Sequence, residues 1–246
     1  MYLYKPGLLA VTLLLLTVAG KSQDQGDLLV KAPNVQKRVV GAFHAIDVSN
    51  AIDLVIKQGD EDGVAVSAAD PVLRDRIVTR VENGVLLIYL NKNGFHWNWG
   101  WNNQKLKAFV SFKTLSRLSA SGASDVYVDG TIHSDNLTIE LSGASDFKGG
   151  IQAGQLSMNQ SGSSDAVVNG SATNAQINLS GASDFKGYEI AVDVCSVEAS
   201  GSSDTHVTVN KELSVHTSGS SDVYYKGGAV VKEVHTSGSS SLSKKS

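Results

Sequence analysis

The pentapeptide Ser142-Gly143-Ala144-Ser145-Asp146 is one of six copies of the phrase Ser-Gly-(Ala/Ser)-Ser-Asp in this 246-residue chain. A seventh copy, at 237–241, has Ser in place of the final Asp. Successive copies are separated by 18 to 21 residues, and their glycines are Gly122, Gly143, Gly162, Gly181, Gly201, Gly219 and Gly238. A nearly constant period of about 20 residues predicts a solenoid, in which each repeat is one structural unit stacked on the preceding one.

Residues on either side of the phrase alternate between apolar and polar, as they do in strands with one buried face. The positions three residues before the first Ser are all apolar: Leu118, Ile139, Met158, Ile177, Val197, Val215 and Val234. The positions two residues before it are polar, for example Glu140 and Asn159. A second short apolar run follows each Asp and usually ends at Gly. We therefore predict an all-β fold, a parallel β-helix-like solenoid with coils of about 19–20 residues.

The first half of the chain, from Ala32 to Thr114, lacks the phrase but keeps the strand alternation. Asn83-Gly84 predicts a tight turn between strands at 77–81 and 85–90. Asp70-Pro71 predicts a short irregular or helical turn that ends at Arg76. We expect this less regular β N-terminal half to supply the first coils and to cover one end of the solenoid.

Residues 1–20 have the pattern of a secretory signal peptide, with Lys5 followed by an apolar run from Leu8 to Val18. The alternative is an uncleaved membrane anchor, but this run of about 11 residues is shorter than the roughly 20 that a membrane-spanning helix needs. The predicted division is a signal peptide at 1–20, a polar linker at 21–36, a β-helical domain at 37–238 and a polar tail at 239–246. We expect this tail to leave the solenoid near Val234.

The net charge of −3 gives no reason to expect nucleic acid or a charged membrane surface as a partner. The only cysteine, Cys195, excludes an intramolecular disulfide and falls in an inward column, where it is expected to act as a small apolar side chain. We expect an exported protein, periplasmic or on the cell surface, with no membrane span once the signal peptide is removed.

The candidate binding residues lie in the stretch 91–104, which contains all three tryptophans of the chain. Phe95, Trp97, Trp99 and Trp101 form an aromatic platform for sugar rings or for a protein surface in one interpretation. In the other, their rings pack on the apolar end of the solenoid. Alternate spacing of the tryptophans would place the indoles on one side of an extended segment.

Six aspartates, one from each complete phrase, are expected to form a column with one strand spacing between neighbours: Asp125, Asp146, Asp165, Asp184, Asp204 and Asp222. Neighbouring carboxylates about 4.8 Å apart repel by roughly 0.9 kcal/mol even in water. Hydrogen bonds from turn N–H groups and Ser hydroxyls would offset this repulsion. Calcium ions between the coils are the alternative.

A second polar column ends in Glu198, His216 and His235 on consecutive coils. Two imidazoles and a carboxylate are ligands for transition metals. An exposed polar column without metal is the commoner arrangement, and we predict no metal and no cofactor. The sequence also contains no zinc-protease, phosphate-loop or dinucleotide-binding motif.

Three short motifs precede the repeated phrase: residues 38–48 (RVVGAFHAIDV), 81–88 (VENGVLLI) and 115–118 (LSRL). In these motifs the chain resembles the head GIN domain family of Gram-negative bacteria, whose members are called "putative autotransporter adhesins". The resemblance covers roughly residues 39–226. It implies a right-handed β-helical fold, a surface or periplasmic role and no catalytic residues.

Two classes of function remain open at this point. The leading one is a non-catalytic, exported β-helix protein, an adhesin that binds a glycan or a protein partner, and not an enzyme. The alternative is a carbohydrate-active β-helix enzyme of the lyase or hydrolase type. Lys148 and Lys186 share a column beside aromatic residues, but the sequence shows no pair of carboxylates next to them.

Overall fold

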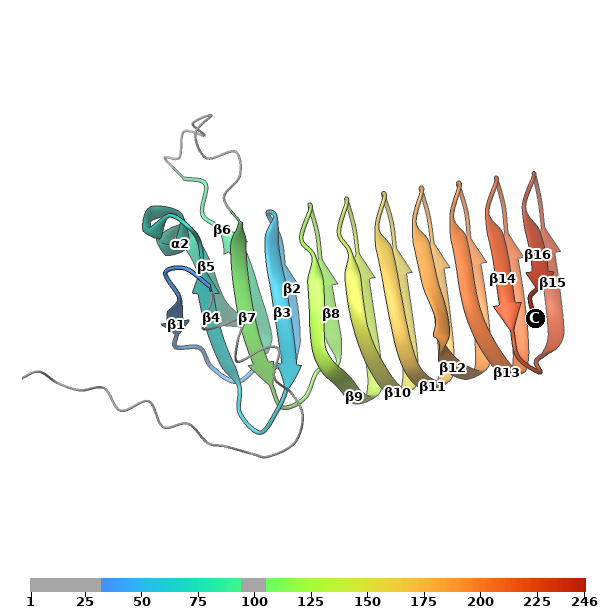
Figure 1. The fold of residues 1–246 in the computed structure, drawn as a ribbon, viewed down its shortest axis with the longest axis horizontal. Helices are drawn as coiled ribbons and strands as arrows, with labels where there is room; N and C mark the ends of the chain where they lie inside the picture. The colour runs from blue at the N-terminus through green and yellow to red at the C-terminus, as the bar shows by residue number, and fades with distance from the viewer. Residues whose placement is uncertain (1–31, 94–104) are drawn as a thin grey trace, which may run out of the picture.

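The structure, a computed structural model, describes residues 32–93 and 105–246. Strands make up nearly all of its regular structure (Figure 1). The elements are β1 Gln36–Arg38, β2 Ala45–Val48, β3 Ile52–Gln58, β4 Gly63–Ser67, α2 Pro71–Arg76, β5 Ile77–Glu82, β6 Val85–Leu90, β7 Leu106–Phe112, β8 Arg117–Ala120, β9 Val126–Leu141, β10 Phe147–Gln160, β11 Asp165–Leu179, β12 Asp184–Ala199, β13 Asp204–Thr217, β14 Asp222–Lys226, β15 Val230–Thr236 and β16 Ser241–Lys244.

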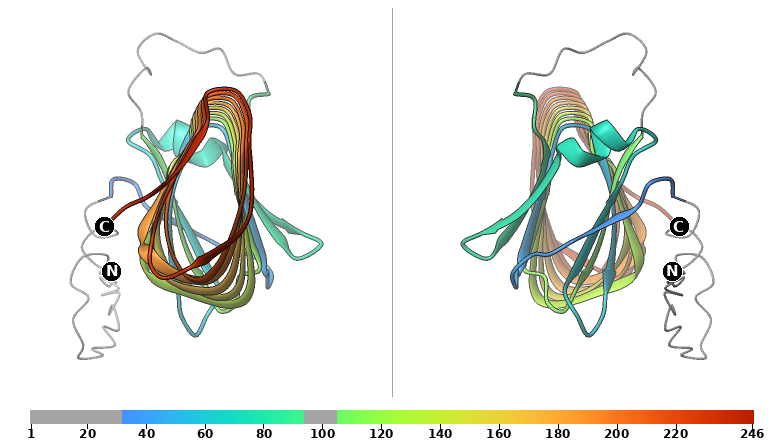
Figure 2. Two further views of the ribbon diagram at one scale, coloured as in Figure 1. Left: turned by 90° about the vertical axis from the view of Figure 1, so that its right-hand side faces the viewer. Right: turned by 90° about the vertical axis from the view of Figure 1, so that its left-hand side faces the viewer.

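The second half of the chain is the predicted solenoid. Strands β9 to β13 pair side by side in parallel, and each runs almost once around the coil (Figure 1). Equivalent residues of the repeat are in register, so that Met158 pairs with Ile177 and Ile177 with Val197. Viewed along the axis, the coils superimpose as narrow rings with the Ser-Gly corner at one end (Figure 2). The prediction of a parallel β-solenoid is confirmed.

The core is a stack of apolar side chains inside these rings. Leu118, Ile139, Met158, Ile177, Val197 and Val215 are fully buried, which confirms six positions of the predicted ladder. Val234, the seventh, is 44% exposed, and the prediction was wrong there. Its strand, β15, is at the open end, where no further coil covers it. Cys195 is also buried, as expected, and burial raises the pKa of its thiol to about 12.

The glycine of each phrase is required by the backbone. Gly162 has a φ of 81°, in the left-handed region that favours glycine. A Cβ atom on Gly162 would lie 2.4 Å from the carbonyl oxygen of Gly143 in the preceding coil. The corners therefore stack more closely than any side chain would permit.

The serine directly before the Asp of each phrase points inward and is fully buried: Ser124, Ser145, Ser164, Ser183, Ser203 and Ser221. Taking Ser183 as an example, its hydroxyl donates to the Ser180 carbonyl at 3.1 Å and accepts the backbone N–H of Ser164 at 3.4 Å. The hydroxyl thus satisfies one polar group of its own corner and one of its neighbour's. This explains why serine recurs at a position facing the core.

The first coils are stacked in an order that differs from their order in the chain. β2 pairs with both β6 and β8, while β3 pairs with both β7 and β9. The β2–β3 coil therefore lies between the later β6–β7 coil and the β8–β9 coil (Figure 1).

Beyond the β6–β7 coil the chain closes this end of the solenoid. β4 pairs antiparallel with β7, β5 pairs antiparallel with β6, and α2 connects β4 to β5 across the end of the ring (Figure 2). The predicted short helical turn is this helix, which Asp70 begins by accepting the backbone N–H of Val72 at 2.8 Å. Within the helix, the side chain of Leu73 is buried. The expected covering of one end is thus observed.

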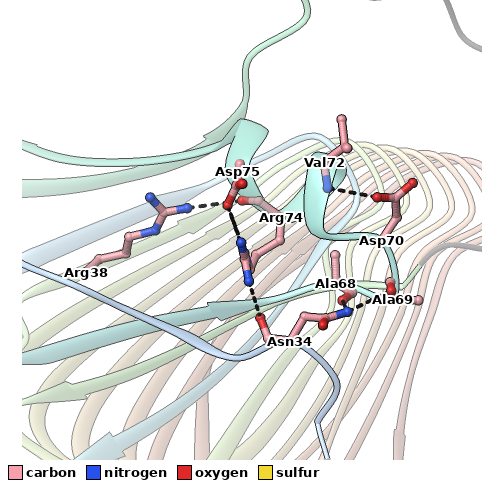
Figure 3. Close-up of polar contacts among 8 residues, drawn as sticks. All are labelled: Asn34, Arg38, Ala68, Ala69, Asp70, Val72, Arg74 and Asp75. Atoms are coloured by element: carbon pink, nitrogen blue, oxygen red, sulfur yellow. Dashed lines mark hydrogen bonds and ion pairs between the residues drawn. The ribbon is translucent and has the colours of Figure 1, made fainter. Parts of the chain in front are cut away.

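The elements β4, α2 and β5 form a cap on this end of the solenoid. Side chains hold β1 and the residues before it against this cap (Figure 3). Asn34 donates to the carbonyls of Ala68 and Ala69, and Arg38 donates to the carbonyl of Arg74. Arg74 in turn donates to the carbonyl of Asn34 and pairs with Asp75 at 2.7 Å.

The prediction of a polar tail leaving the solenoid near Val234 was wrong. β15 pairs in parallel with β13, and β16 pairs with β14, so residues 230–244 form most of one more coil. Ser241, which replaces the Asp of the phrase, donates its hydroxyl to Asp222 at 2.7 Å. Leu242 packs on the core. These contacts hold a sequence that is polar in composition in a strand.

No helix within residues 32–93 and 105–246 has the length and apolar character needed to cross a membrane. The predicted signal peptide lies outside the described residues, so the division of the chain at residue 20 stays a prediction.

Candidate functional site

A groove extends along the solenoid beside the Ser-Gly corners. It has a volume of about 1110 Å³ and is lined by residues from seven successive coils. One side is the outward polar column predicted from the sequence, with members Ser119, Glu140, Asn159, Asn178, Glu198, His216 and His235. The other side includes the first serines of the corners, such as Ser161 and Ser180.

The middle of the groove is uncharged. The side-chain amide of Asn178 donates to the side-chain oxygen Oδ1 of Asn159 at 2.8 Å. The side-chain amide of Asn159 donates to the Ser157 hydroxyl at 3.3 Å. Parallel pairing repeats these groups at the strand spacing of about 4.8 Å. The groove therefore presents two neighbouring amides, Asn159 and Asn178, beside corner serine hydroxyls that recur once per coil.

The end of this column nearest the cap is charged. Arg117 donates to Glu140 at 2.6 Å, and this bond raises the pKa of the Arg117 guanidinium. Asp47, which pairs with Ser119 in the same column, has a raised pKa because burial penalises its charged form. The Arg117 charge partly opposes that shift.

The other end contains the two histidines singled out from the sequence. His216 and His235 pair in register on neighbouring strands, as predicted, and Glu198 pairs with His216. The carboxylate that meets both imidazoles is, however, Glu233, which the sequence reasoning missed. Its outward position two residues before His235 was the signal that could have identified it.

The aspartate column lies on the opposite side of the corners and is longer than predicted. Asp165, Asp184, Asp204 and Asp222 pair in direct register. Asp53 lies in β3, and Asp125 directly precedes β9. Because β3 pairs with β9, Asp53 extends the column beyond Asp125. Lys107, which pairs with Asp53, continues the column on the next strand.

The contacts of these carboxylates agree with the hydrogen-bonding interpretation at some positions and differ at others. Asp146 accepts the backbone N–H of Asp165, and Asp222 accepts the Ser241 hydroxyl. Lys186, by contrast, bridges Asp165 at 2.8 Å and Asp184 at 3.5 Å. The sequence placed Lys186 in a neighbouring column but did not identify it as the partner of two aspartates.

Electrostatics differ along the column. Burial raises the pKa of Asp146, with neighbouring carboxylates adding to the effect, and burial likewise raises the pKa of Asp53. The Ser241 hydroxyl lowers the pKa of Asp222, where the Tyr224 hydroxyl is a second donor. The charged form is therefore less favoured at Asp53 and Asp146 than at Asp222.

The aromatic candidates Phe95, Trp97, Trp99 and Trp101 lie outside the described residues. The strands that flank their segment are described. β6 ends at Leu90, whose N–H donates to Asn50 in the neighbouring corner, and β7 begins at Leu106. Leu90 and Leu106, the strand residues on either side of the segment, thus lie where the other coils have their Ser-Gly corner.

Comparisons with known proteins agree on the fold. Among solved structures, the chain is similar to a "putative adhesin" from Bacteroides fragilis, with 18% identity and a TM-score of 0.76 over 86% of this chain and 96% of that one. A "putative lipid binding protein" from Parabacteroides distasonis has 21% identity and a TM-score of 0.66, over 88% of this chain and 98% of that one. A "putative adhesin" from Parabacteroides merdae has 18% identity and a TM-score of 0.70, over 87% and 96% of the two chains.

Identities this low show a shared fold and nothing further. A comparison with curated proteins finds no match. The family model described as "Putative auto-transporter adhesin, head GIN domain" matches residues 42–229, which is most of the chain. The chain therefore belongs to the head GIN domain family, as its repeats and N-terminal motifs suggested.

Proposed function

We propose that this protein is a non-catalytic, exported adhesin-type domain that binds an extended glycan along the groove. The observation that carries the proposal is the pair of amides of Asn159 and Asn178, in register on neighbouring coils, beside a row of corner serine hydroxyls that recurs on successive coils. Such groups exchange hydrogen bonds with sugar hydroxyls, and a repeating polymer can use the same contact on each coil. The adhesin name of the family is consistent with a binding role.

The aromatic residues Phe95, Trp97, Trp99 and Trp101 are the second part of the proposal. Their segment is flanked by Leu90 and Leu106, at the row of corners beside the groove. A ligand in the groove would extend along the row of corners toward these flanking residues. Flat indole faces pack against the apolar faces of sugar rings, which would add affinity to the polar contacts.

A binding role fits the groove better than glycoside hydrolysis does. Hydrolysis generally needs two carboxyl groups about 5–9.5 Å apart on either side of the bond. The carboxylates lining the groove, Glu140 and Glu198, are three coils apart, about 14 Å at one strand spacing per coil. Glu140 is also paired with Arg117.

Export is proposed from the sequence pattern at 1–20 and from the name of the family. Location in the periplasm or on the cell surface would be distinguished by protease treatment of intact cells followed by immunoblotting.

The binding test is a glycan array probed with four purified proteins: the unmodified chain, a Trp97/Trp99/Trp101→Ala variant, an Asn159/Asn178→Ala variant and Val167→Ala. Val167 is exposed on the other face and is the matched control. We expect both site variants to lose binding while retaining their far-UV spectra, and Val167→Ala to bind normally. Absence of any glycan ligand, or equal binding by all four proteins, would overturn the proposal.

A large loss of stability in the tryptophan variant would favour the alternative in which the indoles pack on the solenoid. Release of new sugar ends from a bound polysaccharide would overturn the non-catalytic part of the proposal.

A further inference from the structure

His216 and His235 form a stacked pair at the last coils of the solenoid. Parallel pairing of β13 with β15 places them directly opposite each other. Their ring centroids are 4.8 Å apart and their planes differ by 25°. Because the two residues pair in register on neighbouring strands, the backbone keeps the attachment points of the imidazoles close together, and rotation of the side chains sets the separation of the rings.

Glu233 completes a three-residue cluster. Its Oε1 is 2.9 Å from Nε2 of His235 and 3.6 Å from Nε2 of His216. One candidate ligand atom from each of the three residues lies within 4.8 Å of the other two. These side chains are thus brought together from two strands, with Glu233 contacting both rings.

Glu233 lies directly after an irregularity in strand pairing. Leu213 pairs with Val231 and Ser214 pairs with Glu233, so Lys232 is an extra residue in β15. The resulting bulge leaves Lys232 to pair with Glu212 at 3.4 Å. From Glu233 to His235 the pairing with Ser214 to His216 is regular, so Glu233 occupies the outward position two residues before His235, on the same face of the sheet.

From this geometry we propose that His216, Glu233 and His235 bind a divalent transition metal ion, Zn²⁺ in the first instance. Two imidazoles and a carboxylate are ligands that suit Zn²⁺, whereas Ca²⁺ and Mg²⁺ prefer sites made of oxygen atoms. Ligand atoms around a tetrahedral Zn²⁺, at about 2.0–2.2 Å from the metal, lie about 3.4 Å from one another. The two distances to Glu233 are already close to that value.

The site is open to solvent, since the side chains of His216, Glu233 and His235 are 43%, 53% and 65% exposed. Water can therefore fill the remaining coordination position, and the two rings need only turn toward each other. The cluster has no buried charge to be compensated, so the fold does not depend on the metal.

Binding would have a structural consequence. β15 is at the end of the solenoid, its residues are mostly exposed, and it pairs with β13 alone. A metal held by His216 on β13 and by Glu233 and His235 on β15 would connect the last coil to the preceding one. We therefore expect the metal to stabilise β15 against local opening.

The inference does not rest on the proposed glycan function. Its test is isothermal titration of Zn²⁺ into untagged protein that has been treated with chelator and dialysed. We expect saturable binding of one Zn²⁺ per chain. His216→Ala and His235→Ala should each weaken it by at least about tenfold, the lower bound seen even for loss of outer-shell partners. His133→Ala, at an exposed histidine outside the cluster, is the matched control and should bind normally.

A second readout follows the strand itself. Hydrogen exchange of the β15 amides should slow on addition of Zn²⁺ in the unmodified chain and not in His235→Ala. Glu233→Gln keeps the shape of the side chain and removes its charge, and we expect weaker binding with unchanged folding. No saturable binding by the unmodified chain would overturn the proposal, as would equal binding by all of the histidine variants.

Discussion

The backbone N–H of Asp165 donates a hydrogen bond to a carboxylate oxygen of Asp146 in the preceding coil, at 3.2 Å. The side chain of one repeat thus joins the backbone of the next, although both residues belong to a column of like charges. Burial nevertheless raises the pKa of Asp146, so this bond only partly offsets the cost of its charge.

Asp146→Asn should raise the unfolding midpoint at pH 7. The raised pKa means that the ionised carboxyl is less favourable in the folded chain than in the unfolded one, and Asn removes the charge while keeping an oxygen that can accept the Asp165 N–H. The advantage should disappear as the pH falls through the raised pKa of Asp146, because the original side chain then becomes neutral too. Denaturation at a series of pH values measures this.

Asp222→Asn is the matched comparison and should have the opposite sign. The Ser241 hydroxyl lowers the pKa of Asp222, so its ionised form stabilises the fold at neutral pH, and that contribution is lost as the pH falls through the lowered pKa. If both variants shifted the midpoint in the same direction at pH 7, this account of the column would be wrong.

Ile177→Ala should lower the free energy of unfolding by about 2–5 kcal/mol, since the side chain is fully buried in the middle of the ladder. Val167→Ala, in the same strand but exposed, should change it by no more than about 0.5 kcal/mol. Urea denaturation followed by circular dichroism compares the two. Equal effects would contradict the assignment of the inward column.

Gly162→Ala should be strongly destabilising. A left-handed backbone conformation costs a non-glycine residue about 1–2 kcal/mol, and the new Cβ would in addition collide with the Gly143 carbonyl. Gly228→Ala is the control, because the nearest atom to its Cβ would be 3.6 Å away. Thermal melting distinguishes them, and a Gly162→Ala variant as stable as the control would refute the close stacking of the corners.

Added Ca²⁺ should leave the thermal midpoint of metal-free protein unchanged. Lys186 already forms ion pairs with Asp165 and Asp184, and the Ser241 hydroxyl donates a hydrogen bond to Asp222. A site occupied at a hundred times its dissociation constant would add about 2.7 kcal/mol to stability. A calcium-dependent rise of that size would favour ions between the coils.

The regular half of the fold could be predicted because the residue pattern within each repeat indicates both its corner and its strands. Glycine marks the corner, and inward residues such as Met158 and Ile177 alternate with outward ones at the period of a strand. The position of the β2–β3 coil between two coils that follow it in sequence could not be predicted. Alternation identifies strands but carries no information about which strand lies beside which.

A degenerate copy of the phrase did exist in the first half. Residues 49–53 read Ser-Asn-Ala-Ile-Asp, and Asn50, with a φ of 67°, takes the place of the glycine. Ile52 takes the place of the inward serine and donates its N–H to Ser124. Asn is the residue that most readily replaces Gly in this conformation, so Ser-Asn followed by Asp was the available signal.

The candidate site was predictable in part for the same reason. The outward column that contains Asn159 and His216 followed from the strand period alone. Glu233 belongs to the same outward face, two residues before His235, and could have been identified from that spacing. The extra residue Lys232 in β15 could not be predicted, because nothing in the sequence marks it.

The stacking of near-identical coils has a consequence for how such a protein can change. Each coil from β9 to β13 pairs with the coil before it and the coil after it, and neighbouring coils present matching surfaces. An in-frame duplication or loss of one repeat in the gene would therefore leave every remaining coil with a compatible neighbour. The groove would lengthen or shorten by about 4.8 Å at each such event, so recombination between repeats could adjust the reach of the molecule while the architecture stayed the same.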